Sequence, residues 1–268
     1  MNKVLTGAMI LASTSIHADF LHIEVSNFTG SYKKPDGSAT ASKLTIPNAL
    51  TSKINIELRG VEDGYILQYL DKEYHFKNPP SFINDIETGN WNNINYSTIS
   101  KSLNTGLTSF HSEFAGESLQ IKKFQGKCNF NRAHNESYGL QVLDACLTNS
   151  SFSISYLLSS KVNKLYDILL DLPGFEGINA SEVSLSNANL NIKKNSFSFK
   201  GKVNMGISAN VTIAGKSEYD AKENRVVIKV DKAKASFINI KNKLFQELEK
   251  SETETLKVDN PYIYILLK

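Results

Sequence analysis

The sequence is poor in the residues that mark several classes of protein. Of its 268 residues, two are cysteine, six are proline and one is tryptophan. At this length the chain is too long for a small disulfide-stapled scaffold, and six prolines exclude a proline-rich low-complexity chain. Thirty lysines and arginines nearly balance 27 acidic residues, which gives a formal charge of +3. This near balance is not the basic surface of a nucleic-acid-binding protein, and no nucleic-acid partner is expected.

Long hydrophobic runs are also absent. No stretch approaches the roughly 20 apolar residues of a membrane-spanning helix. The short run Val4–Ala12 follows the basic residue Lys3 and precedes small and polar residues that end at Ala18. This order is typical of a secretory signal peptide over residues 1–18, and a buried N-terminal strand or helix is the alternative. We therefore expect a soluble chain exported to the periplasm or the extracellular space.

The two cysteines, Cys128 and Cys146, fit an oxidising compartment. An even number of cysteines in an exported chain favours a disulfide, which would close a loop containing Arg132 and His134 and stabilise the fold by roughly 3 kcal/mol. Two free buried thiols are the alternative. No further cysteine or histidine stands at ligand spacing. The sequence therefore predicts neither a zinc site nor a cofactor.

Hydrophobic residues recur at every second position from Asp19 onward, which is typical of strands with one apolar and one polar face. The longest such run, Lys202–Ala214, predicts one long, curved or twisted strand with Gly206 available for a bend. A change of parity near Ser186 predicts a bulge. We expect turns at Lys193–Ser196 and Asp220–Asn224.

Two helices and a final strand complete the expected elements. One helix begins near Ser160 and ends at Pro173, and the other covers Asn242–Ser251. A terminal strand is predicted over Leu256–Lys268. Alternation is poor between Asp71 and Asn104, where Asn78-Pro79-Pro80 and the asparagine-rich stretch Asp85–Tyr96 are expected to be loop, with Trp91 as an anchor. A mild division near Asn149 separates a β-rich portion, residues 19–149, from a more regular portion, residues 150–268; one continuous domain is the alternative.

The sequence contains few signs of catalytic chemistry. None of the common metalloprotease, nucleophile-elbow, dinucleotide or phosphate-loop motifs occurs. Two carboxylate pairs stand out, Glu62 with Asp63 in a turn signal and Asp167 with Asp171 on the polar face of a short helix. We therefore expect no enzyme, and a hydrolase built on two carboxylates is the alternative.

The apolar strand faces need a cover. Two sheets that close on each other would make these faces core, whereas one sheet curled around a short helix would leave a groove suited to an acyl chain. Alternation alone does not decide between the two. The candidate groove residues lie on the long strand, the strand after it and the second helix: Val203, Met205, Ile207, Val211, Ile213, Val226, Ile228, Leu244, Phe245 and Leu248.

The last third of the chain resembles bacterial exported proteins of the tubular lipid-binding superfamily. The likeness rests on the order of elements: an amphipathic hairpin (Phe197–Asp220 and Arg225–Ile240), the helix Asn242–Ser251 and the strand Leu256–Lys268. It covers about a third of the chain and includes no fixed motif. The resemblance implies a curved sheet wrapped on a helix, which holds a lipid or serves as an envelope accessory without catalysis.

These observations predict a mainly β protein with two short helices, in which long, curved antiparallel sheets wrap on an amphipathic helix. The expected function is the non-enzymatic binding of a lipid or another hydrophobic ligand. Lysine pairs such as Lys122-Lys123 and Lys193-Lys194 could contact a membrane surface. An envelope assembly factor that binds a protein partner and an outer-membrane β-barrel are the alternatives.

Overall fold

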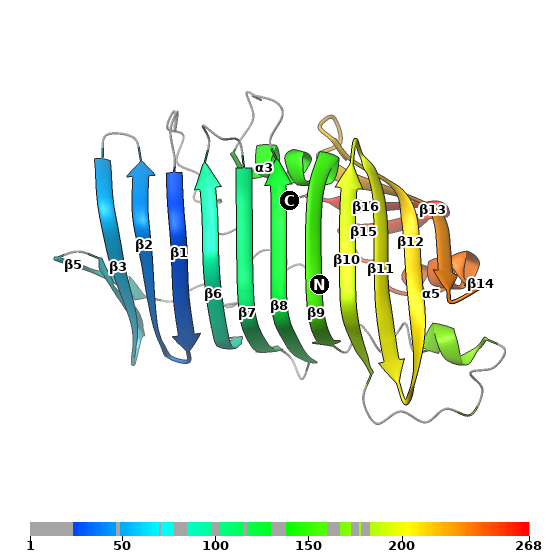
Figure 1. Ribbon diagram of the computed structural model, residues 1–268, viewed down its shortest axis with the longest axis horizontal. Coiled ribbons are helices and arrows are strands. Elements are labelled where there is room, and N and C mark those ends of the chain that lie inside the picture. The colour runs from blue at the N-terminus through cyan, green and yellow to red at the C-terminus, as the bar shows by residue number, and fades with distance from the viewer. Residues whose placement is uncertain are drawn as a thin grey trace. The chain divides into compact units, whose positions relative to one another are not determined.

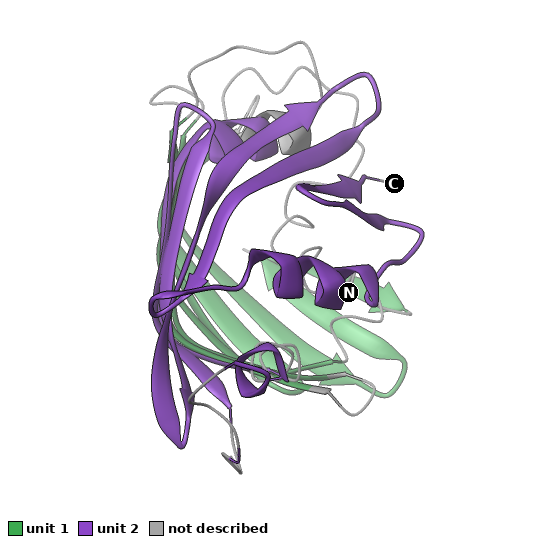
Figure 2. Ribbon diagram, turned by 90° about the vertical axis from the view of Figure 1, so that its right-hand side faces the viewer, with its two compact units in different colours: residues 1–131 green, residues 132–268 purple. Residues whose placement is uncertain are grey.

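A computed structural model of the chain describes residues 24–46, 49–69, 71–77, 85–97, 102–114, 117–129, 138–159, 167–172, 177 and 183–267. The described chain is mainly β, with antiparallel strands and short helices, as the sequence predicts (Figure 1). It divides into two compact units, residues 1–131 (unit 1) and residues 132–268 (unit 2), which Figure 2 shows in green and purple. The predicted signal peptide lies outside the described residues.

Unit 1 is an antiparallel sheet in the strand order β5-β4-β3-β2-β1-β6-β7-β8. No helix occurs among its described residues. Its strands are β1 (Glu24–Lys33), β2 (Asp36–Ile46), β3 (Ala49–Val61), β4 (Gly64–Tyr69), β5 (Lys72–Lys77), β6 (Ile86–Ser97), β7 (Ser102–Phe114) and β8 (Glu117–Asn129).

The prediction of loop over residues 85–96 is wrong, because β6 occupies Ile86–Ser97. The predicted loop at residues 78–80 lies outside the described residues. Bulges account for the poor alternation. The pairing of β6 with β7 shifts register at three places, and Asn93 has a left-handed φ of 53°. Each bulge adds a residue to one strand and changes which positions face the apolar side. In β8, Lys123 has a φ of 52°, at the point where the inward-facing parity changes between Ile121 and Phe124.

The strands of unit 2 are antiparallel and follow the order β9-β10-β11-β12-β13-β16-β15, and β14 pairs with β13. Residues 167–170 form a helical segment. The remaining elements are α3 (Tyr138–Thr148), β9 (Asn149–Ser159), β10 (Ser184–Lys193), β11 (Ser196–Met205), β12 (Ile207–Asp220), β13 (Arg225–Ala235), β14 (Ile238–Asn239), α5 (Lys241–Glu249), β15 (Leu256–Asp259) and β16 (Tyr262–Leu266).

The predicted long strand Lys202–Ala214 is two strands joined by a hairpin. Met205 pairs with Ile207, and Gly206 between them has a φ of 85°, which favours glycine. Because directly opposed residues of an antiparallel pair share a face, alternation passes through a one-residue turn unbroken. The sequence pattern therefore hides this turn.

The other local predictions in unit 2 have mixed outcomes. Turns join Lys193 to Ser196 and Asp220 to Arg225, and a register shift follows Ser186, as predicted. The predicted terminal strand is a hairpin instead, in which Asp259 of β15 pairs with Tyr262 of β16. The helix α5 is confirmed, whereas α3 was not foreseen. Residues 160–166, where the first helix was expected to begin, lie outside the described residues.

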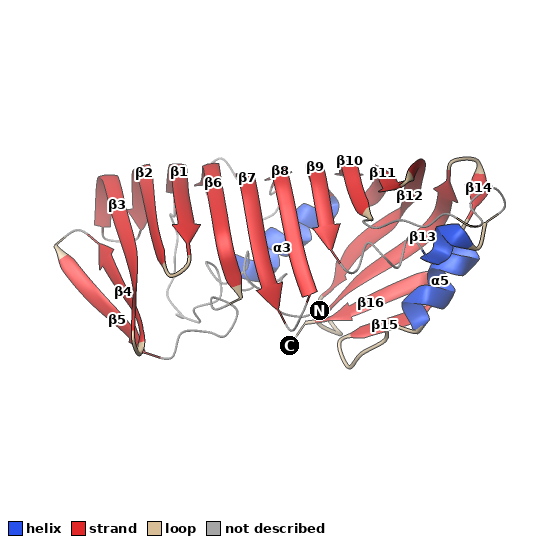
Figure 3. Cartoon of the chain, turned by 90° about the horizontal axis from the view of Figure 1, so that it is seen from below, coloured by secondary structure: helices blue, strands red, loops and turns tan. Residues whose placement is uncertain are grey.

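The hydrophobic core of unit 2 lies between its sheet and its helical segments. Phe245 of α5 is 1% exposed, and α5 contacts β13 and β15, as Figure 3 shows. Ile168 and Leu169 from the helical segment at 167–170 complete the core. An ion pair joins Lys243 of α5 to Asp171. The apolar strand faces of unit 2 are thus covered by helical residues of the same unit.

The two cysteines form the predicted disulfide. Cys128 lies in β8 and is 2% exposed, and Cys146 lies in α3. The hydroxyl groups of Ser150 and Ser217 donate hydrogen bonds to backbone carbonyl oxygens of α3, at Cys146 and Leu147. These bonds tie the last turn of α3 to the strands of its own unit.

Candidate functional site

The predicted groove residues are placed mainly in the core of unit 2. Val203, Met205, Val211 and Phe245 are between 0% and 1% exposed. Leu244 and Val226 are also buried, and Ile213, Ile228 and Leu248 pack against the core as partly buried side chains. Ile207 is 45% exposed at the β11–β12 turn. The structure thus brings most of these residues together, as a tightly packed cluster.

Unit 1 has an apolar face of a different kind. Its hydrophobic side chains alternate with exposed polar residues such as Ser31, Glu57 and Arg59. Ile54 is 2% exposed, whereas most of the others are only partly buried. We call this surface the apolar face of unit 1 and define it by Leu58, Leu67, Trp91, Leu107, Phe110 and Phe124.

The register of the sheet aligns these side chains in rows across the strands. Trp91 of β6 lies opposite Leu107 of β7, which lies opposite Phe124 of β8. A second row places Phe110 opposite Ile121. Since directly opposed residues of an antiparallel pair share a face, these rows form one continuous apolar surface.

Trp91 lies close against the backbone of its own strand. A Cβ atom added to Gly89 would lie 2.6 Å from the indole ring of Trp91. Only glycine leaves room for the ring at this position, so the indole covers the strand instead of standing away from it. The single tryptophan of the chain is therefore held on the apolar face.

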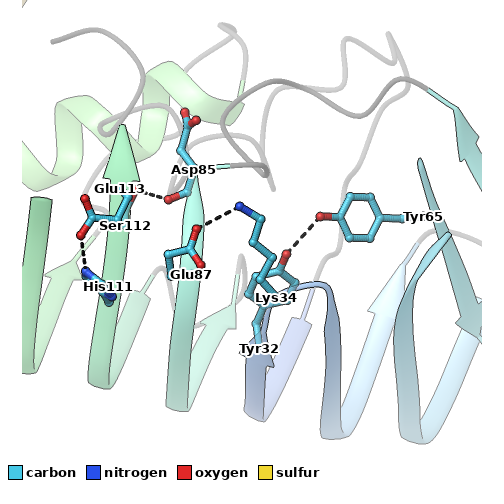
Figure 4. A network of polar contacts seen from close by, with 8 residues as sticks. All are labelled: Tyr32, Lys34, Tyr65, Asp85, Glu87, His111, Ser112 and Glu113. Carbon is cyan, nitrogen blue, oxygen red and sulfur yellow. Dashed lines mark hydrogen bonds and ion pairs between the residues drawn. The ribbon is translucent and has the colours of Figure 1, made fainter. Parts of the chain in front are cut away.

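A pair of tyrosines lies in unit 1 beside the apolar face. Tyr32 of β1 and Tyr65 of β4 are 7% and 6% exposed, and their hydroxyl oxygens are 3.1 Å apart (Figure 4). Tyr32 lies opposite Gly89 and Gly37, so its ring belongs to the same face as Trp91. Two hydrogen-bonding hydroxyl groups are thus placed beside an apolar surface.

Charged groups surround this pair at the same end of the sheet. Lys34 follows β1, and its Nζ atom lies 2.9 Å from Oε1 of Glu87. The backbone carbonyl of Asp85 accepts hydrogen bonds from Ser112 Oγ and from the amide of Glu113. These residues and His111 form the polar rim drawn in Figure 4.

His111 is held by its neighbours in the rim. Its Nε2 atom lies 2.8 Å from Oε1 of Glu113 and 3.3 Å from the hydroxyl oxygen of Ser118. The side chains of His111 and Glu113 are 33% and 49% exposed, so the pair is in contact with solvent.

Burial raises the pKa of Tyr32 above its ordinary value, and the hydrogen bond and proximity of Tyr65 add to this effect. Glu87 and Asp36 raise the pKa further through their negative charge. Tyr32 is therefore a neutral hydroxyl at physiological pH. A pair of hydroxyls has two protons and needs one for its mutual bond, so the other proton is available to an acceptor.

The carboxylates singled out in the sequence have ordinary surface partners. Asp171 pairs with Lys243, and Asp63 lies 3.3 Å from the Nζ atom of Lys77. Among the described residues, no group of three histidine, cysteine, aspartate or glutamate side chains is arranged to hold a metal ion. In the same part of the chain, no helix is long and apolar enough to cross a membrane.

Sequence reasoning missed the tyrosine pair and most of the apolar face of unit 1. The signal was present at Ile54, Ile56 and Leu58 of β3, where alternation is regular. The bulges of β6 and β7 obscured it elsewhere. No protein family, curated protein or solved structure matches this chain.

Proposed function

We propose that this protein is an exported, non-enzymatic binder of a lipid or another hydrophobic ligand, which it holds on the apolar face of unit 1. The observation that carries the proposal is the partial exposure of Trp91, Leu107, Phe110 and their neighbours. Contiguous exposed apolar surface on a protein typically marks a binding site. In unit 2 the corresponding faces are already covered by helical residues of that unit.

The size of the face suits an acyl chain. Its residues extend from Leu67 on β4 to Phe124 on β8, across seven neighbouring strands. Six spacings of about 4.8 Å give a path of about 29 Å along the sheet. One acyl chain spans half the hydrocarbon thickness of a bilayer, which is about 15 Å. This length is shorter than the path, so one extended chain fits along it.

The tyrosine pair supplies a polar contact for the other end of the ligand. The spare proton of Tyr32 and Tyr65 would be donated to an acceptor such as a carboxyl, ester or phosphate oxygen of a head group. A few well-placed polar groups in an apolar site are what fix the orientation of a ligand. The ligand could come from a membrane surface or from another envelope protein.

The proposal of export rests on the segment at residues 1–18 and on the disulfide. Non-enzymatic binding is proposed because the sequence contains none of the common catalytic motifs. In the rim, His111 contacts Ser118 and Glu113 through the same ring nitrogen, Nε2, whereas in a catalytic triad the carboxylate holds the other nitrogen. The tyrosines bond to each other, and Lys34 is neutralised by Glu87.

The test is extraction of the purified protein with organic solvent, followed by mass spectrometry and by titration with a fluorescent fatty acid. We expect a co-purified acyl lipid and saturable uptake of the probe. Leu107→Asp places a charge on the apolar face and is expected to reduce uptake at least about tenfold, because a charge is costly to bury. Thr108→Asp adds the same charge at the neighbouring exposed position and should leave uptake unchanged.

Absence of any lipid from the wild-type protein, together with no uptake of the probe, would refute the proposal. Equal loss of uptake in both variants would also count against it, because the apolar face would then have no special role. Far-UV circular dichroism of both variants verifies that each still folds.

A further inference from the structure

Strand β5 is an edge strand whose six residues are all exposed. It pairs with β4, and no other strand pairs with it among the described residues. Tyr74 and Phe76 are 43% and 48% exposed, which is unusual for large aromatic side chains. An open strand edge with exposed aromatic residues is a template for pairing with another strand.

The hairpins on either side of β4 define which backbone groups of β5 face outward. Tyr69 pairs with Lys72 across a two-residue turn, and so does Val61 with Gly64. The closing pair of such a hairpin is hydrogen-bonded, and hydrogen-bonded and non-hydrogen-bonded pairs then alternate. The backbone N–H and C=O groups of Tyr74 and Phe76 accordingly form hydrogen bonds to β4. Glu73, His75 and Lys77 direct their N–H and C=O groups to the open edge.

The sequence of this edge is complementary to itself. Consider two copies of β5 that run antiparallel, with His75 of one copy opposite His75 of the other. Glu73 of each copy then lies opposite Lys77 of the other copy. On the other face, Tyr74 of each copy lies opposite Phe76 of the other copy. Opposite charges and aromatic pairs are the cross-strand combinations that stabilise sheets.

This register also satisfies the backbone. The residues that it places in hydrogen-bonded pairs are Glu73, His75 and Lys77, which are those with outward-facing N–H and C=O groups. Lys77 is accessible for the new ion pair, since its side chain is 73% exposed and its contact with Asp63 is a surface pair at 3.3 Å. A register shifted by two residues in one direction opposes Lys72 to Phe76, and a shift in the other direction opposes His75 to Lys77; both shifts lose the two ion pairs.

From this double match we infer that β5 is a self-recognition edge, through which two copies of the chain associate antiparallel about His75. The inference does not depend on ligand binding by the apolar face. One strand pair is small beside the roughly 1,200–2,000 Å² of stable interfaces, so the dimer is weak and forms as concentration rises.

The test is analytical ultracentrifugation of the full chain at concentrations up to about 1 mM, the range in which weak dimers are populated. Glu73→Lys and Lys77→Glu each replace two ion pairs by repulsive pairs, and each is expected to raise the dimer Kd at least about tenfold. Lys200→Glu, an exposed position on β11, should leave the Kd unchanged.

Mixing the two single variants gives the sharpest result. A Glu73→Lys chain opposite a Lys77→Glu chain regains both ion pairs, so the mixture should form a heterodimer although neither variant dimerises alone. The double variant Glu73→Lys/Lys77→Glu should regain wild-type dimerisation.

The register has its own readout. His75→Cys places two thiols at a hydrogen-bonded pair, where the Cα atoms are about 5.5 Å apart, within disulfide range. Mild oxidation should give covalent dimers of His75→Cys and not of Glu73→Cys. A wild-type chain that stays monomeric at about 1 mM overturns the inference, as does a mixture of the single variants that forms no heterodimer. Binding of β5 to a different protein by an otherwise monomeric chain would overturn it too.

Discussion

The two units use the same alternation of hydrophobic and polar residues with different results. In unit 2, Val203 and Met205 are 0% exposed beneath helical residues of their own unit. In unit 1, Trp91, Leu107 and Phe110 occupy equivalent inward positions and stay partly exposed, and no helix occurs among its described residues. Alternation thus establishes that a strand has an apolar face. A segment such as α5 decides whether that face becomes core.

The tyrosine pair of unit 1 differs from the buried serines of both units, since Ser112 of unit 1 also donates to a backbone carbonyl oxygen. In unit 2, Ser150 and Ser217 donate to backbone carbonyl oxygens, which satisfies them within the fold. In unit 1, Tyr32 and Tyr65 bond to each other and keep one proton for a further acceptor. The serine hydroxyls are thus satisfied by backbone, whereas the tyrosine pair retains a proton that the proposed ligand would accept.

The largest expected effect is a difference in stability between two phenylalanine truncations. Phe245→Ala empties a position that is 1% exposed and should lower the free energy of unfolding of unit 2 by about 3–5 kcal/mol. Phe110→Ala removes a side chain that is already partly hydrated, so unit 1 should lose about 1–2 kcal/mol. Native-state hydrogen exchange reports the two units separately.

Equal losses of unfolding free energy in the two variants would contradict the difference between the two units. That result would mean that Phe110 is as well packed as Phe245. We expect Phe245→Ala to be the more destabilising of the two variants.

A smaller effect is expected from the tyrosine pair at high pH. Since the pKa of Tyr32 is raised in the folded state, its contribution to stability is complete below the ordinary tyrosine pKa of about 10 and is lost as pH rises above that value. Tyr32→Phe should lower stability by about 1 kcal/mol at neutral pH and weaken this alkaline dependence.

Thermal unfolding followed by circular dichroism between about pH 8 and 11 measures both effects, in the range where tyrosine titrates. Tyr74→Phe is the control, because Tyr74 is 43% exposed. An alkaline profile that is unchanged in Tyr32→Phe would show that the buried hydroxyl has no part in the pH dependence.

The fold class, the helix α5, the turns at Lys193–Ser196 and Asp220–Asn224 and the disulfide were all accessible from the sequence. The turn at Gly206 was not, because Met205 and Ile207 keep the same parity across it. Strand β6 was missed because its bulges interrupt alternation. The two wrong predictions have the same cause, because the alternation of hydrophobic and polar residues reveals neither a one-residue turn nor the position of a bulge.

The candidate site was less accessible than the fold. Predicted groove residues such as Val203 and Phe245 are core, because tertiary packing decides which apolar face is covered. The pairing of Tyr32 with Tyr65 depends on the strand order β1-β2-β3-β4, and sequence periodicity contains no information on strand order.

The most direct test of the central claim compares a reporter on each unit during binding of a brominated fatty acid, whose bromine atoms quench tryptophan on contact. Trp91 is the only tryptophan and lies on the apolar face of unit 1. The double variant Trp91→Phe/Phe199→Trp moves the reporter to a side chain that packs against the core of unit 2. We predict saturable quenching of Trp91 and none in the double variant. If the double variant is quenched and Trp91 of the wild-type chain is not, the ligand binds to unit 2, which would contradict binding on the apolar face of unit 1.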